Sequence, residues 1–323
     1  MTASQQTITV LCGGVGAARF LRALRMVVDP AQVTGIVNTG DDTVLHGLAI
    51  SPDLDTITYT LAGAIDPVRG WGLTGESWRA MEALGRYAAV RPSGSTAAPT
   101  WFNLGDTDLA THFYRTARLA EGATLTEVTS EIALAWGLPE RIVPMTDDRV
   151  ATLVELASGP TVSFQEYFVK LRHDVPVRAV AFDGASAATL QPTARTAITD
   201  ADAVVIAPSN PIVSIGPMRS LTDVDGLLSS RRSSVVAISP IVGGAALKGP
   251  ADRMLVELGH DASVVGVARL YREIAATLVI DPVDAHLSAA VEAEGMRCVV
   301  VPSVMTTPDI GATLARAALD ATN

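Results

Sequence analysis

The chain has 323 residues, 48% of them hydrophobic, with 34 acidic and 24 basic side chains. This length allows one large domain or two ordinary ones, and this apolar content excludes an intrinsically disordered chain. The formal net charge of −10 argues against a nucleic-acid partner, which needs a basic face. A small anionic ligand stays compatible with it, because backbone amides, a metal ion and a few arginines can hold one locally.

No stretch approaches the roughly 18 consecutive apolar residues of a membrane span. The N-terminus also lacks a basic segment followed by an apolar one. We therefore expect a cytoplasmic protein without a membrane partner. Cys12 and Cys298 lie in apolar runs typical of strands, and we expect both to be unpaired core residues.

The first predicted elements are a strand, a glycine turn and a helix, in TITVLCGGVGAARFLRAL. The turn contains Gly13, Gly14 and Gly16. Such a loop either brings backbone amides close to a phosphate at a helix N-terminus or simply makes a tight turn. The dinucleotide fingerprint would have a third glycine where Arg19 stands, so the pattern does not favour an NAD site.

A second strand, QVTGIV, ends in the turn NTGDD and is followed by the helix start SPDLDTITYTLAG. We expect Ser51 to be the N-cap of this helix and Pro52 its first residue. The chain thus begins as an α/β unit.

Four carboxylates, those of Asp41, Asp42, Asp53 and Asp55, fall within fifteen residues of these two loops. Singly, each is ordinary, because acids favour the first turn of a helix and aspartate favours turns. Together at one sheet edge they would repel one another unless something compensates their charge. Carboxylates and a substrate phosphate are what Mg²⁺ uses as ligands. We therefore predict a cation site that a phosphate ligand completes.

Residues 66–139 are predicted to form a mostly helical insert that covers one end of the sheet. Its helices are expected in GESWRAMEALGRY, DLATHFYRTARLAEG and TLTEVTSEIALAWG, the last opening on a capping box of Thr124 and Glu127. Asp106 can cap the second of these helices. Asp108 and His112 lie nearby, but a lone histidine on a helix is more often structural than catalytic.

Residues 1–65 and 140–323 are predicted to form the core. TLVELASGPTVSFQEYFVKL predicts a β-hairpin and VRAVAFDG a strand. Further β runs alternate with helical segments: ADAVVIAPSNP, SSVVAISPIVGG, ASVVGVARL, ATLVIDP and RCVVVPSVM. This alternation predicts an α/β fold with a doubly wound, Rossmann-like, mostly parallel sheet. The last seventy residues carry no chemical motif, and their expected role is to complete the sheet.

Ligands gather beyond the carboxyl ends of the strands in such a sheet, and two later loops there carry suitable side chains. Ser209 and Asn210 end an apolar strand and suit either a nucleotide base or phosphate, or a turn with a capped helix. Lys248, one of two lysines in the chain, lies in a glycine-rich loop where it can meet a phosphate or only solvent.

In this order, these loops closely resemble the 2-phospho-L-lactate transferase family, which builds the deazaflavin coenzyme F(420). The matching pieces span residues 8 to about 250: GGVGAARF, VNTGDD, SPDLDT, DPVRGWG, LGDTDLATH, PMTDDRVAT, FQEYFV, APSNPIVSIGP and SPIVGG. RGWG followed by ESW, and WFNLGD, are similar to the actinobacterial, phosphoenolpyruvate-type branch.

The resemblance implies a Mg²⁺-dependent transferase that moves a phospho-acid from a guanosine diphosphate-linked donor to the ribityl 5′-hydroxyl of Fo, 7,8-didemethyl-8-hydroxy-5-deazariboflavin, releasing GMP. The archaeal branch transfers 2-phospho-L-lactate. The bacterial branch uses the enolpyruvyl donor and gives dehydro-coenzyme F(420)-0, and we favour that donor here. The resemblance also implies a homodimer.

The same resemblance implies roles for individual residues. Fo would meet Asp55 and Asn103, a position that is often basic in relatives. The metal would be held by Asp42 or Asp41 together with Asp55. The guanine nucleotide would lie on the glycine loop and on the SNP loop, which are formed by Gly13, Gly14, Gly16, Ser209, Asn210 and Pro211.

Two roles remain open at the level of the sequence. A carboxylate near the metal can accept the proton of the attacking hydroxyl, and Asp55 or Asp53 is our candidate. Trp71, Trp78 and Trp101 can stack on the deazaflavin or pack in the core.

Two other functions compete with the transferase. A non-catalytic guanine-nucleotide-binding regulatory protein of the same fold would not need the RGWG and LGDTD motifs. A nicotinamide-dependent oxidoreductase is disfavoured by the missing third glycine and by the absence of an acid closing the second strand in the usual place.

Overall fold

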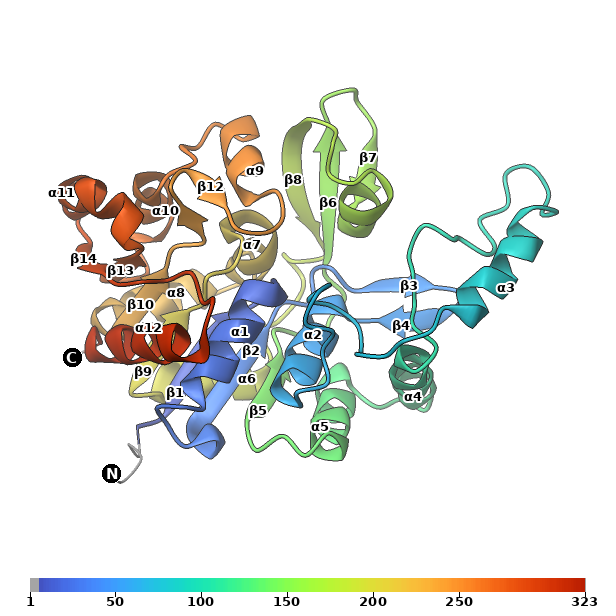
Figure 1. The fold of residues 1–323 in the computed structure, drawn as a ribbon, viewed down its shortest axis with the longest axis horizontal. Coiled ribbons are helices and arrows are strands. Elements are labelled where there is room, and N and C mark those ends of the chain that lie inside the picture. Colours follow the sequence, from blue (N-terminus) through green and yellow to red (C-terminus); the bar gives the residue numbers. More distant parts are fainter. Residues whose placement is uncertain (1–5, 323) are drawn as a thin grey trace.

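The computed structural model describes residues 6–322 and is built on a seven-stranded sheet (Figure 1). The strand order is β14-β13-β10-β9-β1-β2-β5, and all neighbouring strands are parallel. The strands are β1 (Ile8–Cys12), β2 (Val33–Val37), β5 (Arg141–Pro144), β9 (Ala203–Ile206), β10 (Val235–Ile238), β13 (Thr277–Ile280) and β14 (Arg297–Val300). The predicted α/β class and parallel sheet are confirmed.

Helices cover both faces of this sheet, because successive strand residues point to opposite sides. Val10 of β1 enters one hydrophobic cluster and its neighbour Leu11 the other. The first cluster includes residues of α1 (Gly14–Leu24), α2 (Pro52–Leu61) and α12 (Pro308–Asp320). The second includes residues of α6 (Pro192–Asp200), α7 (Gly216–Arg219), α8 (Val224–Ser230), α9 (Ala251–Glu257), α10 (Val264–Tyr271) and α11 (Ser288–Ala293).

The strand order reverses direction between β1 and β9. From β1 the chain proceeds outward through β2 and β5, and it returns to the other side of β1 with β9, β10, β13 and β14. In open α/β sheets a ligand crevice lies at such a switch point, beyond the carboxyl ends of the two strands. The loops that follow β1 and β9 therefore flank the expected binding crevice.

The remaining helices and strands lie outside the seven-stranded sheet. Residues 66–139 contain α3 (Arg79–Ala88), α4 (Asp108–Ala120) and α5 (Leu125–Ala135), and the predicted capping box of Thr124 and Glu127 is present. Figure 1 shows a hairpin of β3 (Thr43–Leu45) and β4 (Leu48–Ile50) reaching toward α3 and α4. Small antiparallel sheets are formed by β6 (Ala151–Leu156), β7 (Thr161–Ser163) and β8 (Val177–Asp183), and by β11 (Ile241–Val242) and β12 (Ala245–Ala246).

One predicted strand is wrong. The run ASVVGVARL forms helix α10, whose N-cap Ser263 accepts a hydrogen bond from the Gly266 amide. Because this helix is buried almost all round, its sequence lacks the polar face that marks an amphipathic helix.

One predicted helix cap differs, and another is confirmed in position. Asp106 caps α3 rather than α4, since its carboxylate accepts from the amides of Arg79 and Ala80 at 3.0 Å. Glu76 in turn accepts from the Asp108 amide at the start of α4. Ser51 is the N-cap residue of α2 and Pro52 its first residue, as predicted, but the Ser51 hydroxyl makes no capping hydrogen bond and donates to Asp42.

The described chain has no membrane-spanning helix and two free cysteines. Within residues 6–322, no helix combines the length and the apolar character needed to cross a bilayer. Cys12 and Cys298 are free thiols, the first buried and the second half-buried.

Candidate functional site

A cavity of about 580 Å³ opens at the carboxyl edge of the sheet, between the loops after β1 and β9. Most of the residues singled out in the sequence line it: Gly13, Gly14, Gly16, Asp41, Asp53, Asp55, Trp71, Asn103, Ser209 and Asn210. Asp42 and Pro211 do not. One cavity therefore collects the glycine loop, the SNP loop, the carboxylates of α2 and part of segment 66–139.

The glycine loop is in direct contact with the loop after β9. The Ser209 hydroxyl donates to the Gly13 carbonyl at 2.9 Å and accepts from the Gly13 amide at 3.2 Å. A Cβ at Gly16 would lie 2.5 Å from the Pro208 carbonyl oxygen, and one at Gly13 would lie 2.6 Å from an Asp53 oxygen. These two positions exclude side chains because other groups already occupy that space.

Gly16→Ala is therefore expected to lower the free energy of unfolding by about 1–3 kcal/mol, the usual cost of overpacking. Denaturant unfolding measures this loss.

Gly226→Ala in α8 is the matched control, because nothing lies within 4 Å of the added methyl group. It should be neutral or stabilise by about 0.5–1 kcal/mol. Equal stability of Gly16→Ala and wild type would contradict the close approach at Gly16.

Asp53 belongs to α2 but serves the start of α1. Its Oδ1 accepts from the Gly14 amide at 2.8 Å, and its Oδ2 accepts from the Asn38 side-chain amide at 3.0 Å. Helix α1 has no acid in its own first turn, so Asp53 supplies the negative charge there. Burial raises the pKa of Asp53 to about 6, although both hydrogen bonds act in the opposite direction.

Asp41 and Asp42 form the uncompensated part of the cluster. In the described part of the chain, Oδ1 of each is buried without a hydrogen-bond partner. Burial, followed by the charges of Asp53 and Asp42, raises the pKa of Asp41 well above its usual range. Burial likewise raises the pKa of Asp42 to about 8, against a hydrogen bond from Ser51 and the charge of Arg115. Orphaned oxygens and neighbouring like charges fit a divalent cation bound by oxygen ligands.

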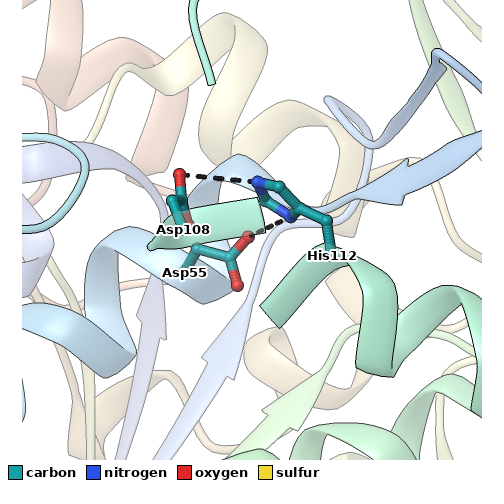
Figure 2. A group of neighbouring side chains, drawn as sticks. All are labelled: Asp55, Asp108 and His112. Atoms are coloured by element: carbon teal, nitrogen blue, oxygen red, sulfur yellow. Dashed lines mark ion pairs between the residues drawn. The ribbon is translucent and has the colours of Figure 1, made fainter. Parts of the chain in front are cut away.

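Asp55 lies in a different environment, together with Asp108 and His112 of α4 (Figure 2). The three offer ligand atoms within 4.8 Å of one another and could hold a metal ion. His112 Nδ1 is 3.7 Å from Asp55 Oδ2, and His112 Nε2 is 3.4 Å from Asp108 Oδ2. However, Arg115 already contacts both Asp55 oxygens, so a positive charge is present beside this group.

Asp108 differs from the other carboxylates in the sign of its pKa shift. Its burial would raise the pKa, but hydrogen bonds from His112 and Tyr59 and the charge of Arg115 lower it overall. The Tyr59 hydroxyl donates to Asp108 at 2.6 Å. The Asp55 carboxylate is thus paired with a cationic side chain, whereas Oδ1 of Asp41 and Oδ1 of Asp42 have no hydrogen-bond partner among the described residues.

Aromatic and basic side chains occupy another part of the wall. Trp71 lines the cavity and packs against Trp78 with ring centroids 6.0 Å apart. The Arg69 guanidinium lies 5.4 Å and 5.3 Å from the centroids of these two rings. Lys248 approaches the Arg69 carbonyl at 3.4 Å, so the RGWG turn meets the loop before α9. A planar aromatic ligand and an anionic group can both be accommodated here.

Several cavity residues were missed in the sequence. Residues 303–306, after β14, line the cavity, so the last seventy residues do more than complete the sheet. Phe164, Gln165 and Phe168 also contribute, from within the FQEYFV motif. Arg115 was not singled out at all, although its spacing of i+7 from Asp108 and i+3 from His112 would have placed all three on one helix face.

Known proteins provide an independent comparison. Residues 8–310 match the family described as "2-phospho-L-lactate transferase CofD". A phosphoenolpyruvate transferase of Streptomyces griseus is 42% identical over 317 residues, covering 97% of each chain. One from Nocardia farcinica is 40% identical over 97% of this chain and 94% of its own.

A solved structure supports the fold alone. Protein BH3568 of Bacillus halodurans superposes with a TM-score of 0.63 at 13% identity, covering 98% of this chain and 100% of its own. The family match and the full-length relatives, together with the motifs in one cavity, lead to one conclusion. The chain belongs to the CofD family of 2-phospho-L-lactate transferases.

Proposed function

We propose that this transferase moves a phosphoenolpyruvyl group from a guanosine diphosphate-linked donor to the ribityl 5′-hydroxyl of Fo, releasing GMP and giving dehydro-coenzyme F(420)-0. A 2-phospho-L-lactyl donor is the alternative. The enolpyruvyl donor is favoured by the full-length relatives from Streptomyces griseus and Nocardia farcinica, which carry the name phosphoenolpyruvate transferase. The observation that carries the proposal is the single cavity in which nucleotide-type loops, carboxylates and aromatic side chains meet.

In this proposal the guanine nucleotide lies on the two loops that flank the switch point. The glycine loop and the start of α1 would receive phosphate oxygens, and the SNP loop (Ser209, Asn210 and Pro211) would approach the nucleoside. The acceptor would lie toward Asp55, Asn103 and Trp71. Its ring system would then rest on the aromatic wall and its ribityl chain would point to the carboxylates.

Asp41 and Asp42, with Asp53 beside them, would hold Mg²⁺. The bound ion would neutralise diphosphate charge and favour an in-line displacement. Asp55, which the family resemblance also assigns to the metal, is paired with Arg115 and is the weaker candidate for this role. Asp53 is the better candidate for the general base, because burial raises its pKa to about 6 and because the Asp55 carboxylate is already held by Arg115.

A coupled assay tests the proposal. Purified protein, Fo, Mg²⁺, GTP and a donor-forming guanylyltransferase are offered phosphoenolpyruvate, 2-phospholactate or 3-phosphoglycerate in turn, and products are resolved by mass. We expect a Fo phosphodiester with phosphoenolpyruvate and its loss on adding EDTA. Binding of GDP without any phosphodiester would instead support the guanine-nucleotide-binding regulatory protein.

A further inference from the structure

Helix α4 buries charged side chains and exposes aromatic ones, the opposite of an ordinary surface helix. Its buried side chains are those of His112 and Arg115, which are 1% and 2% exposed, whereas Phe113 and Tyr114 are 56% and 45% exposed. Burying charged groups costs desolvation free energy, and apolar residues in their place are often equally or more stabilising. The polar inner face of α4 is therefore not explained by stability.

The buried face of α4 forms hydrogen bonds with the segment that leads into α2 and with Asp55 in the first turn of α2. Arg115 Nη1 donates to Asp55 Oδ2 at 3.1 Å, and its Nη2 donates to the other Asp55 oxygen. Nη1 also lies 3.4 Å from the Ala49 carbonyl, while the Thr116 hydroxyl accepts from the Ala49 amide at 2.8 Å. A bidentate guanidinium fixes the plane of a carboxylate as well as its charge. Helix α4 thereby holds Asp55 in one orientation.

His112 links this pair to a second carboxylate. Arg115 Nη1 lies 3.4 Å from His112 Nδ1. On the other side of the ring, His112 Nε2 faces Asp108 Oδ2 at 3.4 Å. Asp108 also accepts from Tyr59. These side chains form one buried series of contacts that ends at Asp55, although His112 Nε2 has no hydrogen-bond partner among the described residues.

The linked side chains differ in whether they reach the cavity. Asp55, Asp108 and His112 line the cavity, whereas Arg115 lies behind Asp55. Figure 2 shows His112 of α4 between the two carboxylates. The guanidinium supplies, from behind, the positive charge that a metal ion would bring to these three side chains. Each carboxylate oxygen has more than one lone pair, so Asp55, which lines the cavity, can also accept from neutral donors.

We propose that Arg115 is a positioning residue for the acceptor: it takes the place of a metal ion at the Asp55, Asp108 and His112 group and presents the Asp55 carboxylate to hydroxyl groups of a polyol chain. This inference rests on the proposed function, in which Fo supplies that chain. It assigns cation binding to Asp41 and Asp42 and acceptor binding to Asp55.

Titration of Fo, followed by deazaflavin fluorescence, tests the proposal on wild type, Arg115→Met and Arg115→Lys, with GDP titrations in parallel. Arg115→Met should weaken Fo binding at least tenfold and leave GDP affinity within twofold. Arg115→Lys should recover part of the loss, because it restores the charge but not the fork. In turnover, KM for Fo should rise by a larger factor than kcat falls.

Arg118→Met is the matched control, since Arg118 lies on the same helix, does not line the cavity and pairs with Glu121 and Glu131. It should bind Fo and GDP as wild type does. A separate titration with Mn²⁺ alone asks whether Asp108→Asn removes a bound ion, and we expect the number of bound ions to stay the same.

The outcomes separate the two proposals. Wild type that fails to bind Fo overturns the proposed function. The positioning role is overturned if Arg115→Met binds Fo as tightly as wild type does, or if the variant loses affinity for Fo and for GDP by the same factor. It is also overturned if Asp108→Asn binds one Mn²⁺ ion fewer than wild type. If Arg115→Met does not fold, Arg115→Lys and His112→Gln are measured in its place. Each is expected to have a KM for Fo at least threefold above that of wild type. An unchanged KM in both would overturn the proposal.

Discussion

Replacing Asp53 with asparagine is expected to lower the rate of transfer to Fo by roughly 10²- to 10⁴-fold, the usual loss when a general base is removed. Asp53 lines the cavity, touches the glycine loop and stands beside Asp41. Asparagine keeps the size and the acceptor for Gly14. It removes the charge and turns an amide donor toward the Asn38 side chain, whose own oxygen is already held by the Gly40 amide at 2.9 Å.

Single-turnover and steady-state rates of Fo phosphodiester formation measure this loss, and the pH profile identifies its origin. Because the base must be deprotonated, the wild-type rate should rise with pH through an apparent pKa no higher than the value of about 6 that burial gives Asp53, since a bound cation lowers it. The residual activity of Asp53→Asn should lack this limb.

Two further variants serve as comparisons for Asp53→Asn. Asp55→Asn should act chiefly on the KM for Fo, because Asp55 is proposed to bind the acceptor rather than its proton. Glu273→Gln changes a side chain that is 82% exposed and should behave as wild type. An Asp53→Asn enzyme that turns over within threefold of wild type would falsify the assignment of Asp53 as base.

The parts of the site that could be predicted are those that depend on local sequence. A glycine turn directly after an apolar run, as at Gly13 to Gly16, specifies strand, loop and helix by itself. The same holds for the acids at the start of α2. Because parallel strands present their carboxyl ends at one edge, the sequence also indicates that these loops lie on the same side of the sheet.

The parts that could not be predicted depend on contacts between distant segments. Arg115 is sixty positions from Asp55, and on an exposed helix an arginine is ordinarily solvated. Residues 303–306 carry no recognisable motif, and they reach the cavity because they connect the edge strand β14 to α12, which packs in the same hydrophobic cluster as α1. The strand predicted at α10 failed for a related reason: burial on most sides removes the periodicity that separates helix from strand.

In EDTA, the free energy of unfolding is expected to fall as the pH rises from about 4 to about 8, and Mg²⁺ should restore it at the upper end. Asp42 has a folded pKa of about 8 and Asp53 of about 6, both raised by burial, and that of Asp41 is raised as well. The unfolded chain releases these protons near pH 4. Between pH 4 and the folded pKa, the folded state therefore binds more protons, so stability decreases with pH by up to about 1.4 kcal/mol per unit for each such group.

Denaturant unfolding at pH 5, 6.5 and 8, with EDTA or with Mg²⁺, measures this dependence. Asp42→Asn should be more stable than wild type at pH 8 in EDTA, because it removes the buried charge, and should respond less to Mg²⁺. Glu273→Gln should follow wild type throughout. Stability that rises toward pH 8 in EDTA, or a Mg²⁺ effect equal at pH 5 and pH 8, would contradict a cation site built from these carboxylates. A cation that binds the ionised carboxylates stabilises the folded state in proportion to the logarithm of its concentration over its dissociation constant, and protonation at pH 5 removes the ligands themselves.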